Sequence, residues 1–301
     1  MNNSTHLLYV PFTGLGLYGG FRGNNWLRNR IKIFKQFVIP SLLAQINKNF
    51  TLWISWRPQE RDNKQVIELK QYLYTTGLKS VFTYGGVCFW DDKFNDDVAW
   101  DRLAMALHHS VNDIGEVLTG AWVYMTIQPS DDCYNSNAVE EIQQTFEQTD
   151  AQAFGYSKGY VAQYQTKAIA EYNPITNPPF FTIKFPKGTF LDPLSHMKYT
   201  GPYKSHEYVG NALKYFVTDK RGFLVGCHGE NISTIFNHPF KGADVSQDIL
   251  KEFGLENAEP LKIRINLGKR LLRKLPHRWQ RKLRYIFGEK FYARLYNIRN
   301  G

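Results

Sequence analysis

The order of apolar segments along the chain constrains its fold more than any other sequence feature. Short runs of apolar, β-forming residues alternate with longer segments whose apolar residues recur at helical spacing. The expected strands are 7–12, 50–56, 80–84 and 121–127, and the expected helices are 26–44, with Pro40 as a potential kink, 64–75 and 97–110. A β-α-β-α-β-α-β order predicts an α/β protein with a doubly wound, mostly parallel sheet.

The second half of the chain follows a different pattern. After a helix expected near 136–148, two strands of mixed polarity are expected at 151–165 and 180–190, separated by Asn-Pro and Pro-Pro turns. A short helix near 206–215 and a strand near 222–226 complete this half. We interpret it as α+β decoration on the parallel sheet, carrying loops that select the substrate.

The positive charge of the chain is concentrated at its end. The whole sequence carries +10, but residues 261–301 hold 13 Lys and Arg and a single acid, Glu289, which leaves −2 on residues 1–260. A domain-wide basic surface for nucleic acid is therefore disfavoured, and we expect no nucleic-acid partner.

The basic tail also has a regular apolar pattern. Pro276 divides it into two expected helices, and Gly288 ends the second. Its apolar residues recur every four positions at Leu267, Leu271, Leu275, Trp279, Leu283 and Phe287. A basic amphipathic helix of this kind predicts contact with an anionic membrane surface through 261–301. The alternative is that the stripe packs on the body. We assign 1–255 to the main domain and 256–301 to the tail.

Composition predicts a cytoplasmic protein, which the basic tail would hold at the inner face of the cell membrane. No apolar run is long enough to span a bilayer, and the first residues lack the layout of a signal peptide. Three cysteines, Cys88, Cys133 and Cys227, are scattered without metal-site spacing, which favours a reducing compartment.

Two adjacent carboxylates follow the strand at 121–127. That strand runs into Gln-Pro-Ser and then Asp131 and Asp132. Open α/β sheets bind ligands where their strands end, and two neighbouring acids repel unless a cation or solvent offsets them. The pair predicts a divalent metal or a cationic ligand. The alternative is a solvated loop in which Asp132 caps a helix at 135–147.

Several further segments resemble bacterial rhamnosyltransferases of the GT-A glycosyltransferase superfamily. The similar segments are 22–30 (RGNNWLRNR), 34–37 (FKQF), 40–42 (PSL), Gln45, 50–53 (FTLW), 126–132 (TIQPSDD) and 227–233 (CHGENIS). They cover roughly residues 7–240 in order and spacing. The resemblance implies a GT-A fold and transfer of a sugar, with rhamnose as one candidate, from a nucleotide-sugar donor to a glycan or lipid-linked acceptor of a surface polysaccharide.

The acid motif departs from the family pattern. Where the family places an acid two residues before the pair, this chain has Pro129, whose side chain cannot bind a metal or a ribose hydroxyl. Asp131 and Asp132 must then act alone, or donor binding is altered. The alternative function is a catalytically inactive GT-A-like domain that binds a glycan or a partner enzyme.

The resemblance also implies roles for individual residues. Asp132, assisted by Asp131, would hold Mg²⁺ or Mn²⁺ against the donor diphosphate. His228, in a Gly-flanked turn, matches a late metal or phosphate ligand, although it is equally a plausible loop residue. Glu207 would be the base of an inverting displacement, although as a first-turn acid it also suits a helix that Ser205 caps.

Two arginines are candidate donor ligands. Arg22 flanks a Gly-rich loop, which holds five glycines within 14–23, and Arg102 precedes the acid-bearing strand, although Arg102 would also pair with a neighbouring acid. Arg30, on the helix after the loop, is either a phosphate ligand or a surface residue. The acidic loop at 91–97 is interpreted as a solvated turn rather than a second cation site.

Overall fold

The structure is a computed structural model of the 301-residue chain. It describes residues 3–13, 24–85, 110–175, 178–192, 195–196, 199, 209–229, 231 and 234–263. Most of the helix expected at 97–110 and residues 264–301 of the tail lie outside these ranges. Within the described residues, no helix is long and apolar enough to cross a membrane.

The first four strands form a parallel sheet, as the sequence predicts. They are β1 (Ser4–Val10), β2 (Thr51–Ser55), β3 (Ser80–Thr83) and β4 (Trp122–Ile127). Their order across the sheet is β3-β2-β1-β4, and each neighbouring pair is parallel. Side chains alternate across β1, with Leu8 and Val10 in one apolar cluster and Leu7 and Tyr9 in another. The predicted α/β class is confirmed.

The expected helix at 26–44 is one continuous helical run with a wider turn in its middle. It comprises α1 (Asn24–Ile33), a π-helix (η1, Phe34–Val38) and α2 (Ile39–Leu43). Pro40 has no N–H and its ring crowds the preceding turn, so a widened turn just before it lets the helix continue. The second helix, α3 (Lys64–Thr76), starts at an Asn63 cap and ends at Gly77, whose φ is +75°.

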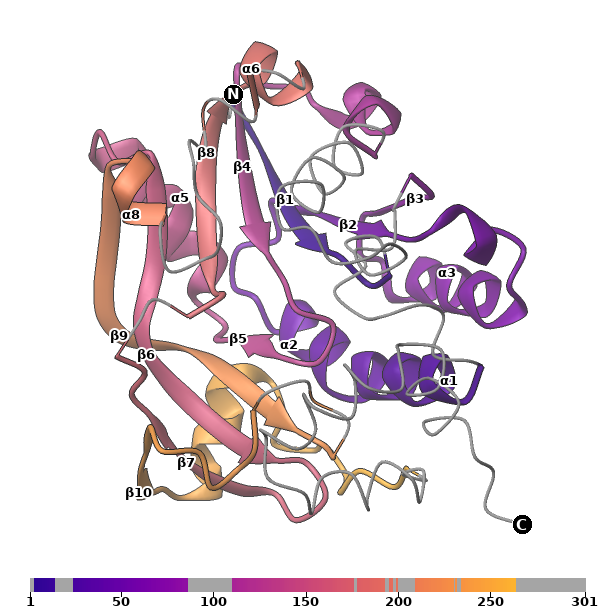
Figure 1. The fold of residues 1–301 in the computed structure, drawn as a ribbon, viewed down its shortest axis with the longest axis vertical. Helices are drawn as coiled ribbons and strands as arrows, with labels where there is room; N and C mark the ends of the chain where they lie inside the picture. Colours follow the sequence, from indigo (N-terminus) through magenta and orange to yellow (C-terminus); the bar gives the residue numbers. More distant parts are fainter. Residues whose placement is uncertain are drawn as a thin grey trace, which may run out of the picture.

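The second half adds mostly antiparallel strands to the β4 edge of the sheet (Figure 1). Strand β8 lies antiparallel to β4, β6 pairs with β7, β8 and β9, and β9 also holds the short β5. These strands are β5 (Cys133–Tyr134), β6 (Ala153–Gln163), β7 (Ala168–Tyr172), β8 (Phe181–Pro186), β9 (Tyr215–Cys227) and β10 (Lys241–Asp244).

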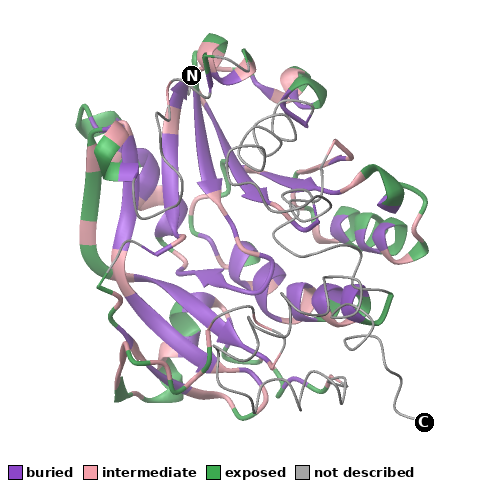
Figure 2. Cartoon of the chain, in the orientation of Figure 1, coloured by how far each residue is buried: buried purple, intermediate pink, exposed green. Residues whose placement is uncertain are grey.

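The remaining helices are short except for α5. The strand expected at 180–190 ends at Pro186, because Lys187–Leu191 forms α6. Besides the α1–α2 helical run and α3, the described helices include α5 (Ala138–Gln148), α6, α8 (Val209–Ala212) and the 3-10 helices η2 (Pro58–Glu60), η3 (Gly115–Val117) and η5 (Gln247–Phe253). Figure 2 shows buried residues running through the sheet strands, with exposed residues on the outer helices.

A buried histidine links β1 to its neighbours. Nδ1 of His6 accepts from the Gln143 side chain at 3.1 Å, so its Nε2 carries the proton and donates to Thr126 Oγ1 at 2.7 Å. Thr126 in turn bonds Thr182 at 2.6 Å. Burial lowers the pKa of His6 to about 3, so the ring is neutral in the folded protein.

Acid is expected to destabilise the fold through His6. The pKa is lowered in the folded state, so the unfolded chain binds the proton first, and stability falls as pH drops from the ordinary value near 6.5 towards 3. Between pH 7 and pH 5 we expect His6 to account for a loss of about 2 kcal/mol. Urea unfolding of wild type and His6→Gln at both pH values measures the difference. Equal pH dependence of the two proteins would contradict this assignment.

Candidate functional site

The topology places one edge of the sheet where ligands bind in α/β proteins. The chain moves from β1 outward to β2 and β3, and then returns to place β4 on the other side of β1. In open α/β sheets such a reversal marks the edge where ligands bind, which here lies at the carboxyl ends of β1 and β4. In Figure 1 both arrows point toward β5 and α2. Asp131 and Asp132 follow the end of β4 after three residues, so the predicted acid pair lies near this switch point.

The acid pair is held between two strands rather than at the start of a helix. Strand β5 begins at Cys133 and pairs with Leu224 of β9. Helix α5 begins only at Ala138, and Asp132 Oδ1 instead accepts the backbone N–H of Gly226 at 2.8 Å. The alternative in which Asp132 caps a helix at 135–147 is therefore wrong, because β5 intervenes and β9 takes the carboxylate.

Asp131 is the centre of a buried ionic cluster. Its Oδ2 lies 2.5 Å from an Arg30 guanidinium nitrogen and 2.9 Å from His228 Nε2, and Asn231 lies 3.5 Å away. Burial alone would raise the pKa of Asp131, but the charge of Arg30 and the His228 hydrogen bond outweigh it and hold that pKa well below its ordinary value. Asp131 is therefore ionised, and His228 Nε2 must donate the proton.

Asp132 stands in a different electrostatic position. Burial raises its pKa well above the ordinary value, and the neighbouring charge of Asp131 raises it further, against the stabilising N–H of Gly226. The two carboxylates are adjacent in the chain yet shifted in opposite directions. Asp131 is neutralised by the protein itself, whereas Asp132 would gain from an added cation.

Arg30 is a residue whose role the sequence left open between a phosphate ligand and a surface residue, and the structure buries it. It is 1% exposed, and its guanidinium also lies 5.6 Å from the ring of Trp26. The signal was present in the helix pattern, because position 30 falls inside the apolar stripe formed by Trp26, Leu27, Ile31 and Phe34. An arginine in the buried stripe of a helix needs an acidic partner, and here that partner is Asp131.

The backbone of the acid pair is held by a hydrogen bond from a buried tyrosine. Tyr164 donates its hydroxyl to the Asp131 carbonyl at 2.9 Å, and its ring stacks on Phe37 of the π-helix with centroids 3.7 Å apart. Asn231 joins the turn after β9 to the cluster, accepting from the His228 N–H at 2.9 Å. The backbone and the side chain of Asp131 are thus held by residues distant in sequence.

A methyl group at Gly226 is expected to displace the acid pair. A Cβ there would overlap the Tyr164 ring and the Asp131 carbonyl, whereas a Cβ at Gly188 meets nothing within 4 Å. We expect Gly226→Ala to lower the free energy of unfolding by about 1–3 kcal/mol and Gly188→Ala to change it by less than about 0.5 kcal/mol. Urea unfolding of the two variants checks this, and equal effects would contradict the close contact.

The described residues fit a divalent cation only in part. No group of three or more His, Cys, Asp and Glu among them is arranged to hold a metal by itself. Among these residues the hydrogen bonds and ion pairs of the acid pair involve Oδ2 of Asp131 and Oδ1 of Asp132, so one oxygen of each carboxylate remains for a cation. Mg²⁺ and Mn²⁺ accept such oxygens and take their other ligands from phosphate and water.

The remaining predicted site residues are divided between the cluster and the undescribed chain. His228 is fully buried and joins the acid pair, but through a hydrogen bond to Asp131. Its metal role, with that of the acid pair, stays a prediction. Arg22, Arg102, Glu207 and the acidic loop at 91–97 lie outside the described residues.

Comparison with known proteins gives partial structural likeness only. No family model and no curated protein matches the sequence. Among solved structures, S. aureus TarS residues 1–349 with UDP has TM-score 0.39 and 10% identity over 74% of this chain and 60% of that one. A longer TarS structure has a TM-score of 0.39 and 13% sequence identity, and the match covers 98% of this chain and 53% of that one.

A third solved structure is a candidate nucleotide-diphospho-sugar transferase from Desulfovibrio desulfuricans G20. It gives TM-score 0.35 and 10% identity over 75% of this chain and 82% of that one. The chain spans only about half to three fifths of the TarS chains it resembles. We therefore base the proposal below on the site of this chain itself.

Proposed function

We propose that this chain is a nucleotide-sugar glycosyltransferase of the GT-A type that works at the switch point between β1 and β4. The observation that carries the proposal is the opposite treatment of the two acids. Asp131 is paired with Arg30 at 2.5 Å, whereas Asp132 is buried with its pKa raised. A buried carboxyl group whose charged form a cation would stabilise, at the edge where α/β sheets bind nucleotides, suits a donor diphosphate with its metal.

Each part of the cluster has a task in this proposal. Asp132, with the remaining oxygen of Asp131, would hold Mg²⁺ or Mn²⁺, which when bound offsets the charge of the departing diphosphate. Arg30 and His228 keep Asp131 ionised and oriented, so the pair presents a fixed geometry to the donor. Arg22 and Arg102 are proposed as donor ligands on the sequence evidence alone.

The acceptor hydroxyl requires a base in an inverting displacement, and we propose Glu207. Loss of the carboxylate in Glu207→Gln is expected to remove transfer while leaving donor binding intact. Equal loss of donor binding would instead point to a role in holding the nucleotide. Rhamnose as the sugar, and a glycan or lipid-linked acceptor, remain part of the proposal through the family resemblance.

A donor panel tests the proposal most directly. Purified protein is incubated with nucleotide sugars with and without Mn²⁺, and hydrolysis and thermal shift are measured. We expect one donor class to stabilise the protein and to be hydrolysed with metal. Donor binding without turnover would favour the inactive, glycan- or enzyme-binding alternative, which Pro129 supports. Neither binding nor hydrolysis across the panel would reject the enzyme.

We also propose that the basic tail holds the protein at an anionic membrane surface, on the cytoplasmic side. Leu261 is buried in the core, and its N–H donates to the Tyr164 carbonyl at 2.8 Å, so a truncation should begin after Ile263. The protein ending at Ile263 is expected to float less with anionic vesicles than the full chain. Equal flotation would contradict the tail proposal.

A further inference from the structure

The body of the protein is electrically polarised along its sequence. Residues 24–85 hold ten Lys and Arg against three acids, a net charge of +7, whereas residues 110–260 hold eleven against eighteen, a net charge of −7. The near-neutral total of the body therefore conceals two opposite halves. Such segregation creates a surface potential that a domain-average charge does not reveal.

Part of the positive charge of residues 24–85 lies on two neighbouring helices. On α1, Arg28 and Lys32 are exposed and lie one helical turn apart. On α3, Lys64 and Lys70 are exposed. The ammonium of Lys35 lies 4.2 Å from the ring centroid of Tyr72, which joins the two helices into one surface. Figure 1 shows α1 and α3 side by side, and Figure 2 shows exposed residues along α3.

Apolar side chains are exposed among these cations. Tyr74 is 87% exposed, Ile67 is 42% exposed and Tyr72 is 36% exposed, all on α3. Ile67 and Tyr74 are seven residues apart and thus lie on one helix face, next to that of Lys64 and Lys70. Long basic side chains mixed with aromatic and aliphatic ones suit the boundary between lipid headgroups and acyl chains. A soluble polyanion would use the charges and gain nothing from the apolar groups.

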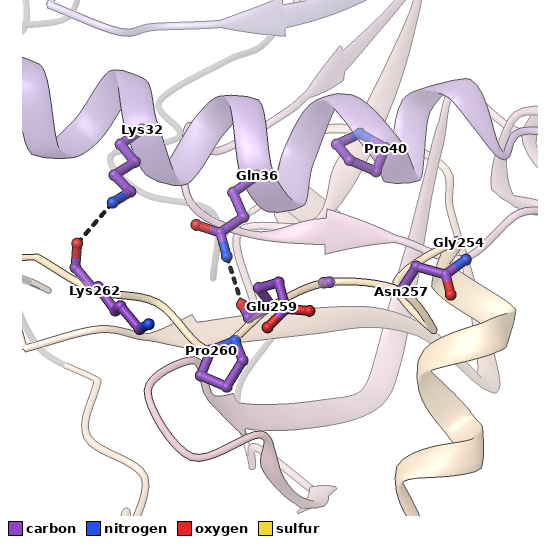
Figure 3. A pocket seen from close by; sticks show the side chains of 9 residues that line it. Lys32, Gln36, Pro40, Gly254, Asn257, Glu259, Pro260 and Lys262 are labelled. Carbon is purple, nitrogen blue, oxygen red and sulfur yellow. Dashed lines mark hydrogen bonds between the residues drawn. The ribbon is translucent and has the colours of Figure 1, made fainter.

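The basic tail begins beside the same surface. Lys32 Nζ donates to the Lys262 carbonyl at 2.8 Å, and Gln36 Nε2 donates to the Glu259 carbonyl at 2.5 Å. Figure 3 shows these two side chains reaching from the α1–α2 helical run to the segment at 257–262. The groove between the helical run and this segment has a volume of about 510 Å³. The last described residues are thereby held against α1, and the +12 segment continues from there.

We propose that the exposed face formed by Arg28, Lys32, Lys64, Ile67, Lys70 and Tyr74 is a second membrane-contact surface that docks on anionic phospholipid. The inference extends the tail proposal and does not depend on transferase activity. It also orients the site. Arg30 faces inward to Asp131 while Arg28 and Lys32 face outward, so one helix, about 10 Å across, separates the acid pair from the lipid. An acceptor carried on that membrane would lie within reach.

Vesicle binding by the full chain tests the surface. The variant Arg28→Gln/Lys64→Gln/Lys70→Gln removes three exposed charges and leaves Lys32 to hold the tail. The matched control, Lys214→Gln/Lys220→Gln/Lys251→Gln, removes three exposed charges from the acidic half. Affinities are measured by flotation on phosphatidylcholine vesicles with and without phosphatidylglycerol, at a salt concentration where binding is not saturated.

In the α1/α3 variant, Arg28→Gln/Lys64→Gln/Lys70→Gln, we expect each substitution to lower the affinity for anionic vesicles about fivefold. The affinity of the control variant should stay near that of wild type. Tyr74→Ser alone should also weaken vesicle binding without changing affinity for soluble polyphosphate. Equal losses in both triple variants would overturn the proposal. So would an equal loss of polyphosphate affinity in the α1/α3 variant, which would identify a polyanion site. Donor hydrolysis in solution by these variants reports separately on the proposed function.

Discussion

Arg30→Gln is expected to lower the free energy of unfolding by about 3–5 kcal/mol, because it leaves the buried Asp131 carboxylate without its guanidinium partner. Arg30 is 1% exposed and lies 2.5 Å from Asp131 Oδ2. Removal of the cation also removes the main force that lowers the Asp131 pKa, so this carboxyl should take up a proton at higher pH. Urea unfolding at neutral pH measures the loss.

The exposed Arg28, two residues away on the same helix, provides the matched control. Arg28→Gln should change the free energy of unfolding by less than about 0.5 kcal/mol. The double variant Arg30→Gln/Asp131→Asn should lose less free energy of unfolding than the sum of the losses in the two single variants. The reason is that the double variant leaves neither a buried guanidinium nor a buried carboxylate without its charged partner. Additive losses would mean that the two residues do not interact as the structure places them.

Asp132→Asn is expected to slow the proposed donor turnover strongly without destabilising the fold. The amide has the same shape, and its oxygen can still accept the Gly226 N–H that now reaches Asp132 at 2.8 Å. The change removes a buried carboxyl whose charged form is disfavoured, so stability should stay level or rise. Loss of metal–diphosphate stabilisation worth about 4 kcal/mol would slow donor turnover about 10³-fold.

The pair of experiments separates the two neighbouring acids. Asp131→Asn should resemble Arg30→Gln in losing stability, because it leaves the arginine buried without a counterion. Asp132→Asn should lose turnover with an unchanged urea midpoint. If Asp132→Asn retains wild-type hydrolysis of a donor that wild type turns over, Asp132 is not the residue that holds the metal, and the acid pair serves only the fold.

The sequence predicted the regular elements where burial repeats with a clear period. Strand β4 was expected at 121–127 and lies at 122–127, and α3 was expected at 64–75 and lies at 64–76. The sequence pattern did not predict the elements whose formation depends on pairing between distant strands. The two-residue β5 has too little length to show a period, and it exists because β9 supplies its hydrogen bonds. For the same reason the expected strand at 222–226 is the end of a longer β9.

The amino-acid sequence by itself determined the alternation of strands and helices, and with it the position of Asp131 and Asp132 at the end of a buried strand. That information is local, because the spacing of apolar residues fixes which element forms and which face is buried. Only the tertiary structure decided what the two acids do. Arg30 and His228 reach Asp131 from distant parts of the chain, and Gly226 reaches Asp132. Their charges then drive two adjacent carboxyl groups in opposite directions, since the pKa of a buried group depends on which charges pack around it.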